Sequence, residues 1–138
     1  MKETFNEATT SRPLGDRAID GPLVKADLGL LMKQIRKERK WKESDRNAIT
    51  VFKTTGIRIV LIALHKGAEM TKHAVKGMIS IQVLKGKLKF DSDGRKEELI
   101  DGQILVLHEG ISHSILAKKK STILLTLTKT LVESIPLN

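Results

Sequence analysis

The chain lacks cysteine and tyrosine, and it has only one tryptophan, three phenylalanines and three prolines among its 138 residues. Without cysteine there is no disulfide, no thiolate metal site and no cysteine nucleophile. With so few aromatic rings, and without a helix-turn-helix or RNA-binding signature, the chain offers little to stack on nucleic-acid bases. We therefore expect no nucleic-acid partner, although the formal net charge is +9.

Long apolar runs are absent as well. The longest uninterrupted one, residues 59–64, is far too short to span a bilayer, and the first residues lack the apolar core of a signal peptide. From these absences we expect a soluble, cytoplasmic protein without a membrane partner. The sequence also has no phosphate-binding loop, no Gly-x-Ser-x-Gly nucleophile turn and no His-Glu-x-x-His helix, so several common enzyme classes are poorly supported.

Much of the excess positive charge lies in three segments, residues 33–42, 85–89 and 118–120. The last two coincide with expected turns, where solvated lysines are ordinary. Solubility explains this charge, and so does an acidic small-molecule partner.

The length suits one domain with a real core. Residues 1–22 are polar and interrupted by proline and glycine, which predicts a flexible N-terminal arm. The domain is expected at 23–138, with a helix at about 27–41, a barrel at about 46–129 and a C-terminal tail. Asp27 is placed to cap the helix, and Leu28, Leu31 and Ile35 share one face. We expect this face to pack against the domain; the alternative is a basic helix lying on a membrane surface.

From residue 46 onward the pattern is typical of strands. Segments rich in β-branched and aliphatic residues alternate with turn residues, and Asp93-Gly94 is a strong hairpin signal. The expected strands are residues 47–52, 57–65, 78–84, 87–90, 99–100, 103–107, 112–116 and 121–129. Short strands with turns at this spacing predict an all-β sandwich or barrel.

Two glycine–histidine segments carry a family resemblance. The first has Gly67, His73, Val75, Ile79 and Gly86, and the second has Gly102, His108, Gly110, His113 and Ala117. Their spacing resembles the two motifs of the cupin superfamily over about residues 46–129, and the chain looks like a small single-domain, RmlC-like cupin. The resemblance implies a double-stranded β-helix, that is, a jelly-roll barrel with a short N-terminal helix.

The same resemblance implies a metal site that is degenerate here. Metal-binding cupins commonly supply three histidines and a glutamate, and this chain keeps His73 and His113. Val75 and Ile79 stand where the family has a histidine and the glutamate. A divalent ion (iron, manganese, nickel or zinc) would be held by His73 and His113, with Glu109 as a further, weaker candidate ligand.

The candidate pocket is the barrel interior around His73 and His113. Its other expected lining residues are His108 at the mouth, Val75, Ile79, Met70 and Met78. Trp41 is interpreted as a plug of one barrel opening, and His65 as incidental.

Three functions remain open. The first is binding of a small molecule in the barrel, with or without a weakly held metal. The alternative is a metal-dependent enzyme of the dioxygenase or isomerase kind, with His73 and His113 as ligands. A metal-free epimerase ranks last, because the chain has no tyrosine to act as the acid. From the family we also expect a homodimer. The composition identifies neither the ligand nor a reaction.

Overall fold

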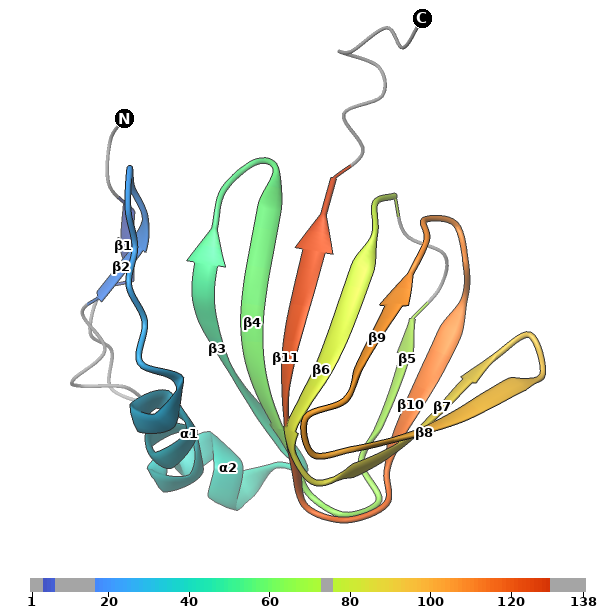
Figure 1. Ribbon diagram of the computed structural model, residues 1–138. Coiled ribbons are helices and arrows are strands. Elements are labelled where there is room, and N and C mark those ends of the chain that lie inside the picture. The colour runs from blue at the N-terminus through green and yellow to red at the C-terminus, as the bar shows by residue number, and fades with distance from the viewer. Residues whose placement is uncertain (1–3, 7–16, 73–75, 130–138) are drawn as a thin grey trace, which may run out of the picture.

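The computed structural model describes residues 4–6, 17–72 and 76–129. The body of the fold is two antiparallel sheets that face each other (Figure 1). The five-stranded sheet has, in spatial order, β3 (Arg46–Lys53), β4 (Ile57–Leu64), β11 (Ser121–Thr128), β6 (Ile79–Lys85) and β9 (Ile104–Leu107). The four-stranded sheet has β5 (Glu69–Lys72), β10 (His113–Ala117), β7 (Lys87–Ser92) and β8 (Arg95–Ile100). The prediction of an all-β jelly-roll barrel is confirmed.

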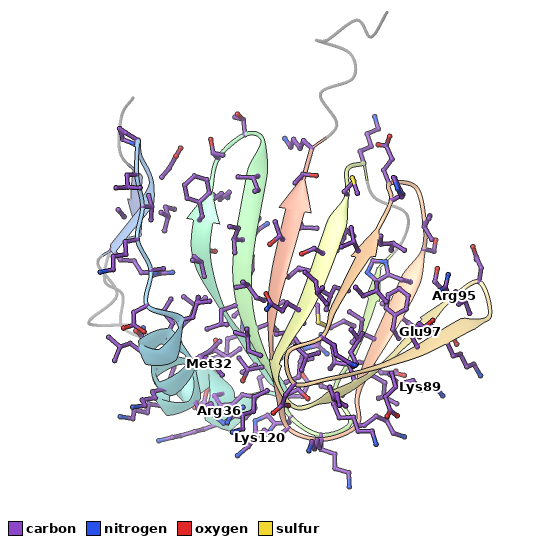
Figure 2. All side chains as sticks on the ribbon, in the orientation of Figure 1. Met32, Arg36, Lys89, Arg95, Glu97 and Lys120 are labelled. Atoms are coloured by element: carbon purple, nitrogen blue, oxygen red, sulfur yellow. The ribbon has the colours of Figure 1, made fainter. Side chains whose placement is uncertain are left out.

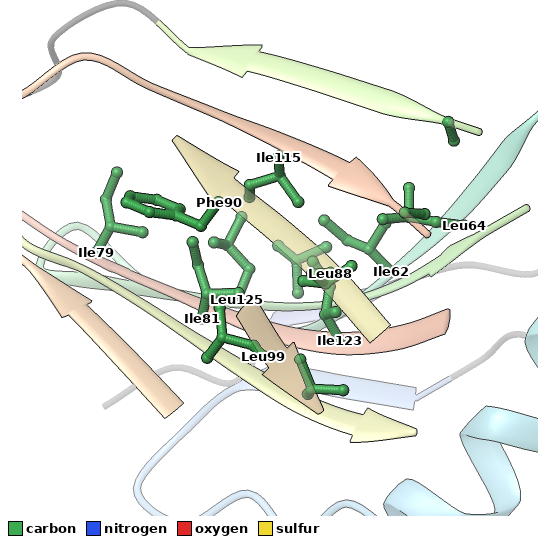
Figure 3. Close-up of a cluster of buried hydrophobic side chains, with 14 residues drawn as sticks. Ile62, Leu64, Ile79, Ile81, Leu88, Phe90, Leu99, Ile115, Ile123 and Leu125 are labelled. Carbon is green, nitrogen blue, oxygen red and sulfur yellow. The ribbon is translucent and has the colours of Figure 1, made fainter. Parts of the chain in front are cut away.

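The core lies between the two sheets. Alternate residues of each strand point inward, and fourteen buried side chains form one cluster there (Figure 3). Ile81, Val83, Leu88 and Ile123 are completely inaccessible to solvent. Ligand space can therefore occur only where this packing stops, at the ends of the strands or at the sheet edges.

Two strands were missed or underestimated by the sequence prediction. β5 has the sequence Glu-Met-Thr-Lys, which shows no strand pattern, yet it pairs with β10. β8 begins at Arg95 rather than at 99, and its first residues are charged and exposed. β8 forms because the Asp93–Gly94 turn, with both residues at positive φ, returns the chain along β7 as predicted.

The helix expected at 27–41 is two helices, α1 (Leu28–Lys37) and α2 (Arg39–Glu43), so a single helix was wrong. The Asp27 cap is confirmed, with its Oδ1 accepting from the backbone N of Leu30 at 3.1 Å. The break at Glu38, whose backbone is extended, is caused by a residue of strand β3. The buried Asn47 side chain donates to the backbone oxygen of Ile35 at 2.9 Å, and thereby occupies the acceptor that would continue the helix.

A second cluster covers the outer face of the five-stranded sheet. Leu31 and Ile35 of α1 pack there against strands β3 and β4, as expected for the helix. Trp41 belongs to this outer cluster, so its interpretation as a plug of the barrel was wrong. His65 stacks on Trp41 with ring centroids 3.4 Å apart, and its Nε2 lies 2.8 Å from the backbone oxygen of Trp41, so it is not incidental either.

The predicted arm contains two short strands, β1 (Thr4–Asn6) and β2 (Arg17–Asp20), which pair with each other. Ile19 of β2 is buried, and Arg17 donates through Nη2 to the backbone oxygen of Thr50 in β3. β2 therefore docks on the barrel, while the division of the chain at residue 22 stays a prediction. No helix among the described residues is long and apolar enough to cross a membrane.

Candidate functional site

His113 lies at the start of β10 and points into the barrel. It shares the inner face with Ile115 and Ala117, and only 4% of it is exposed. Its ring stacks on Phe90 of the neighbouring strand at a centroid distance of 5.7 Å, and its Nδ1 lies 3.5 Å from the backbone oxygen of Ile111. An imidazole at the end of an apolar core is thus held in place on two sides.

The other predicted pocket residues separate into two groups. Ile79 is buried in the main cluster, and Met70 packs against that cluster opposite Ile115. His108 lies exposed in the loop between β9 and β10, and Met78 is 37% exposed at the end of the barrel. His73 and Val75 lie outside the described residues.

Glu109, the weaker ligand candidate, is exposed in the same loop as His108, and its Oε2 accepts from the backbone N of Gly77 at 3.3 Å. Within the described ranges no three histidine, cysteine, aspartate or glutamate side chains come together in a way that could hold a metal ion. The described residues alone therefore do not make up a full ligand set. Coordination by His73 and His113 stays a prediction.

A cavity opens beside His113, where the edge strands β8 and β9 do not meet. Its volume is about 690 Å³. Phe90 and Ile111, which both contact His113, also line this cleft. The full lining is Phe90, Ser92, Arg95, Glu97, Glu98, Leu99, Gly102, Gln103, Ile104, Leu105, Val106, Leu107 and Ile111.

One wall of the cleft is polar and comes from β8. Arg95 and Glu97 are cross-strand partners of Ser92 and Phe90, so they share the inner face with Phe90. Arg95 Nη2 lies 3.2 Å from Glu97 Oε1, and Figure 2 shows both side chains on the β7–β8 hairpin. The opposite wall, from β9, is aliphatic. The cleft can therefore hold an apolar body on one side and fix a polar group on the other.

The sequence prediction missed this polar wall, because it placed only residues 99–100 of β8 in a strand. A usable signal was present: the Asp93–Gly94 turn requires two strands of comparable length, and β7 was recognised.

No family model matches the sequence, and no curated protein matches it either. Solved structures do resemble the fold. A conserved protein of unknown function from Streptococcus pyogenes has 25% identity and a TM-score of 0.59, over 62% of this chain and 75% of that one. A cupin superfamily protein from Desulfitobacterium hafniense has 16% identity and a TM-score of 0.60, over 62% and 78%. A mutant of salicylate 1,2-dioxygenase from Pseudoaminobacter salicylatoxidans has 14% identity and a TM-score of 0.69, over 84% of this chain and 38% of that one.

Proposed function

Because the chain has the cupin fold, we propose that it is a small protein that binds a small molecule in the barrel, in the cleft between β8 and β9 beside His113. One observation carries the proposal. The lining of the cleft of about 690 Å³ includes Phe90 and Ile111, which both contact His113. Cavities of roughly 300–1,000 Å³ with apolar walls and a few polar groups are typical ligand sites.

The lining indicates how a ligand would be held. Leu105 and Leu107 offer an aliphatic surface that continues the core, while Arg95, Glu97 and Gln103 offer charged and amide groups. The Arg95–Glu97 pair is exposed, so a ligand group can exchange with either partner at little cost.

Metal-dependent catalysis is the second candidate. The resemblance to the salicylate 1,2-dioxygenase structure supports it through the fold alone, and function depends on the site rather than on the barrel. Two imidazoles from His73 and His113 would bind a divalent ion more weakly than a full set of four ligands, and the ion would supply Lewis-acid chemistry. We rank small-molecule binding first because the residues that line the cleft are described by the structure, whereas the metal ligands would include His73, which lies outside the described residues.

The experiment is ligand-observed NMR with a set of small carboxylates, sugars and diketones, on the wild type and on Ile111→Trp. Ile111 is half-buried in the loop beside the cleft, so an indole there fills ligand space without entering the core. We expect at least one probe to bind the wild type and to bind Ile111→Trp at least tenfold more weakly, a factor that corresponds to about 1.4 kcal/mol.

The matched control is Lys120→Trp, which places the same ring in the exposed turn between β10 and β11, near the opposite end of the barrel (Figure 2). Binding that survives in Ile111→Trp as fully as in Lys120→Trp would contradict the assignment to this cleft.

A further inference from the structure

A second cavity lies away from the cleft, at the end of the barrel that is uppermost in Figure 1. Here the turn between β3 and β4, the end of β11 and the segment before β6 meet. Its volume is about 380 Å³. We call it the rim pocket, and its lining is Lys53, Thr54, Thr55, Ile57, Arg58, Lys76, Met78, Leu127, Thr128 and Lys129.

Backbone hydrogen bonds hold the walls of the rim pocket together. Thr128 N donates to the oxygen of Met78 at 3.0 Å, and Lys129 N donates to the oxygen of Gly56 at 3.1 Å. Gly77 allows this close approach, because a Cβ at that position would lie 1.5 Å from the oxygen of Thr128. The pocket is therefore formed by three chain segments in fixed contact rather than by one loose turn.

The charge of the rim pocket is one-sided. Among the described residues that line it, four (Lys53, Arg58, Lys76 and Lys129) are cations, and none is an acid. All four are exposed, and in the described part of the chain none of them has an ion-pair partner. The carboxylate of Glu109 accepts from the backbone of Gly77 and does not line the pocket.

Two of the cations lie directly opposite each other. Lys53 and Arg58 are cross-strand partners in the β3–β4 hairpin, a placement at which like charges repel. Arg58 is in turn paired across to Leu127, whose side chain packs against the main core cluster. Positive charge and an apolar surface therefore lie side by side on one face, with Ile57 and Met78 adding apolar lining.

From this arrangement we infer that the rim pocket binds a small organic anion, whose carboxylate or phosphate group meets Lys53 and Arg58 and whose apolar part contacts Leu127 and Met78. An anion relieves the repulsion between the opposed cations, and the threonine hydroxyls of the turn supply further donors. This site is separate from the cleft beside His113, and the inference does not depend on the function proposed for that cleft.

The test uses four probes that share one apolar chain: hexanoate and hexyl phosphate as anions, and hexanol and hexylamine as their uncharged and cationic counterparts. Binding is measured by isothermal titration calorimetry at low ionic strength, on the full chain. We expect saturable binding of one or both anions and none of the other two probes. The preferred anion then tells a carboxylate site from a phosphate site.

The decisive variant is Lys53→Gln/Arg58→Gln, which removes both opposed charges at exposed positions. We expect affinity for the anions to fall by about twofold to thirtyfold, the range for losing two exposed ion pairs. Without a probe, the variant should be at least as thermally stable as the wild type, because a repulsive pair has been removed. The matched control, Lys118→Gln/Lys120→Gln in the turn between β10 and β11, should bind like the wild type.

Absence of saturable anion binding, or equal binding by the wild type and Lys53→Gln/Arg58→Gln, would overturn the inference. Anion binding that is lost in Ile111→Trp but kept in Lys53→Gln/Arg58→Gln would also overturn it. That last result would place the anion in the cleft, and the function proposed for the cleft would stand.

Discussion

Two glycines show how the surroundings of a single residue set its tolerance to change. Gly77 and Gly110 both have positive φ, at 113° and 79°. An added Cβ at Gly110 would meet nothing within 4 Å, whereas at Gly77 it would meet backbone atoms of Thr128. Residue 110 must therefore be glycine for its backbone conformation alone, whereas residue 77 must be glycine also because a side chain has no space.

We expect Gly77→Ala to lower the free energy of unfolding by about 3–5 kcal/mol, because backbone strain and the steric clash with Thr128 add together. Gly110→Ala, the control, should cost about 1–2 kcal/mol from strain alone. Urea unfolding curves measure both. Equal losses in the two variants would show that the packing of residues 76–78 against β11 does not stabilise the fold.

Asp45 provides a pH prediction. The hydrogen bond from the Arg46 guanidinium, at 2.9 Å from Nε to Oδ1, holds the pKa of the Asp45 carboxyl below its usual value. A lowered pKa in the folded state stabilises the protein above the unfolded-state pKa, about 4, and this stability is lost as the pH falls through the folded-state pKa.

Asp45→Asn should therefore be slightly less stable than the wild type at neutral pH, and the two should converge in acid. Thermal unfolding from pH 7 down to about 3 tests this, since the unfolded-state pKa lies inside that interval. The effect is small because the carboxylate is exposed. A stability difference that does not change with pH would contradict the prediction.

The metal prediction also belongs to single residues. We expect the purified protein to hold at most one divalent ion per chain, and His73→Ala/His113→Ala to lose it, because two imidazoles are the expected ligands. Elemental analysis with metal titration measures the content. His108→Ala is the control, since His108 is exposed in a loop and should leave the content unchanged. Unchanged metal in the double variant would exclude this ligand pair.

At the scale of elements, the helical segment shows how one buried side chain divides a helix. Asn47, only 1% exposed, donates to the oxygen of Ile35 and to Glu38 Oε1, and its own Oδ1 accepts from Ala48 N. A side chain of β3 thus supplies the hydrogen bond that the Ile35 oxygen lacks at the end of α1. The chain can then turn into α2, where Trp41 stacks on His65.

We expect Asn47→Leu to lower the free energy of unfolding by about 2–3 kcal/mol, because the Ile35 oxygen loses a buried hydrogen bond and leucine of similar size cannot replace it. Gln34→Ala is the matched control. It removes a 3.0 Å hydrogen bond to the same Glu38 side chain at a less buried position, so it should cost well below 1 kcal/mol. Thermal or urea unfolding compares the two, and equal costs would contradict a special role for Asn47.

At the scale of the whole molecule, strand β9 forms an open edge of the five-stranded sheet. Within the described residues β9 pairs only with β6, and its Ile104 and Val106 are each 57% exposed. Exposed aliphatic residues on an unpaired edge strand are typical of surfaces that associate. We propose the homodimer expected from the family, with this edge in the interface.

Light scattering should give the mass of two 15.4 kDa chains for the wild type. Val106→Lys should shift the protein toward the monomer, because a charge on an edge strand opposes pairing. Lys89→Gln, an exposed change on the other sheet, is the control and should leave the mass unchanged. A monomeric wild type at all concentrations would contradict the proposal.

Much of the fold follows from local sequence. Alternating aliphatic residues in β4, β6 and β11 specify strands with one buried face, and turn residues such as Asp93-Gly94 specify where the chain reverses. The same local rules placed the Asp27 cap and the apolar face of α1. These features could be predicted because the interactions that produce them join residues close in sequence.

What the tertiary structure decided depends on partners far apart in the sequence. β5 is a strand because it pairs with β10, and α1 ends because Asn47 reaches Ile35. Trp41 is buried outside the barrel because it stacks there on His65. The features of the candidate site also divide into those that the sequence predicted and those that only the packing of distant segments decided. The sequence by itself, through its resemblance to the two cupin motifs, predicted that His113 lies in the barrel interior. Only the packing of the two sheets placed a cleft beside it, and only the meeting of three chain segments placed four cations around the rim pocket.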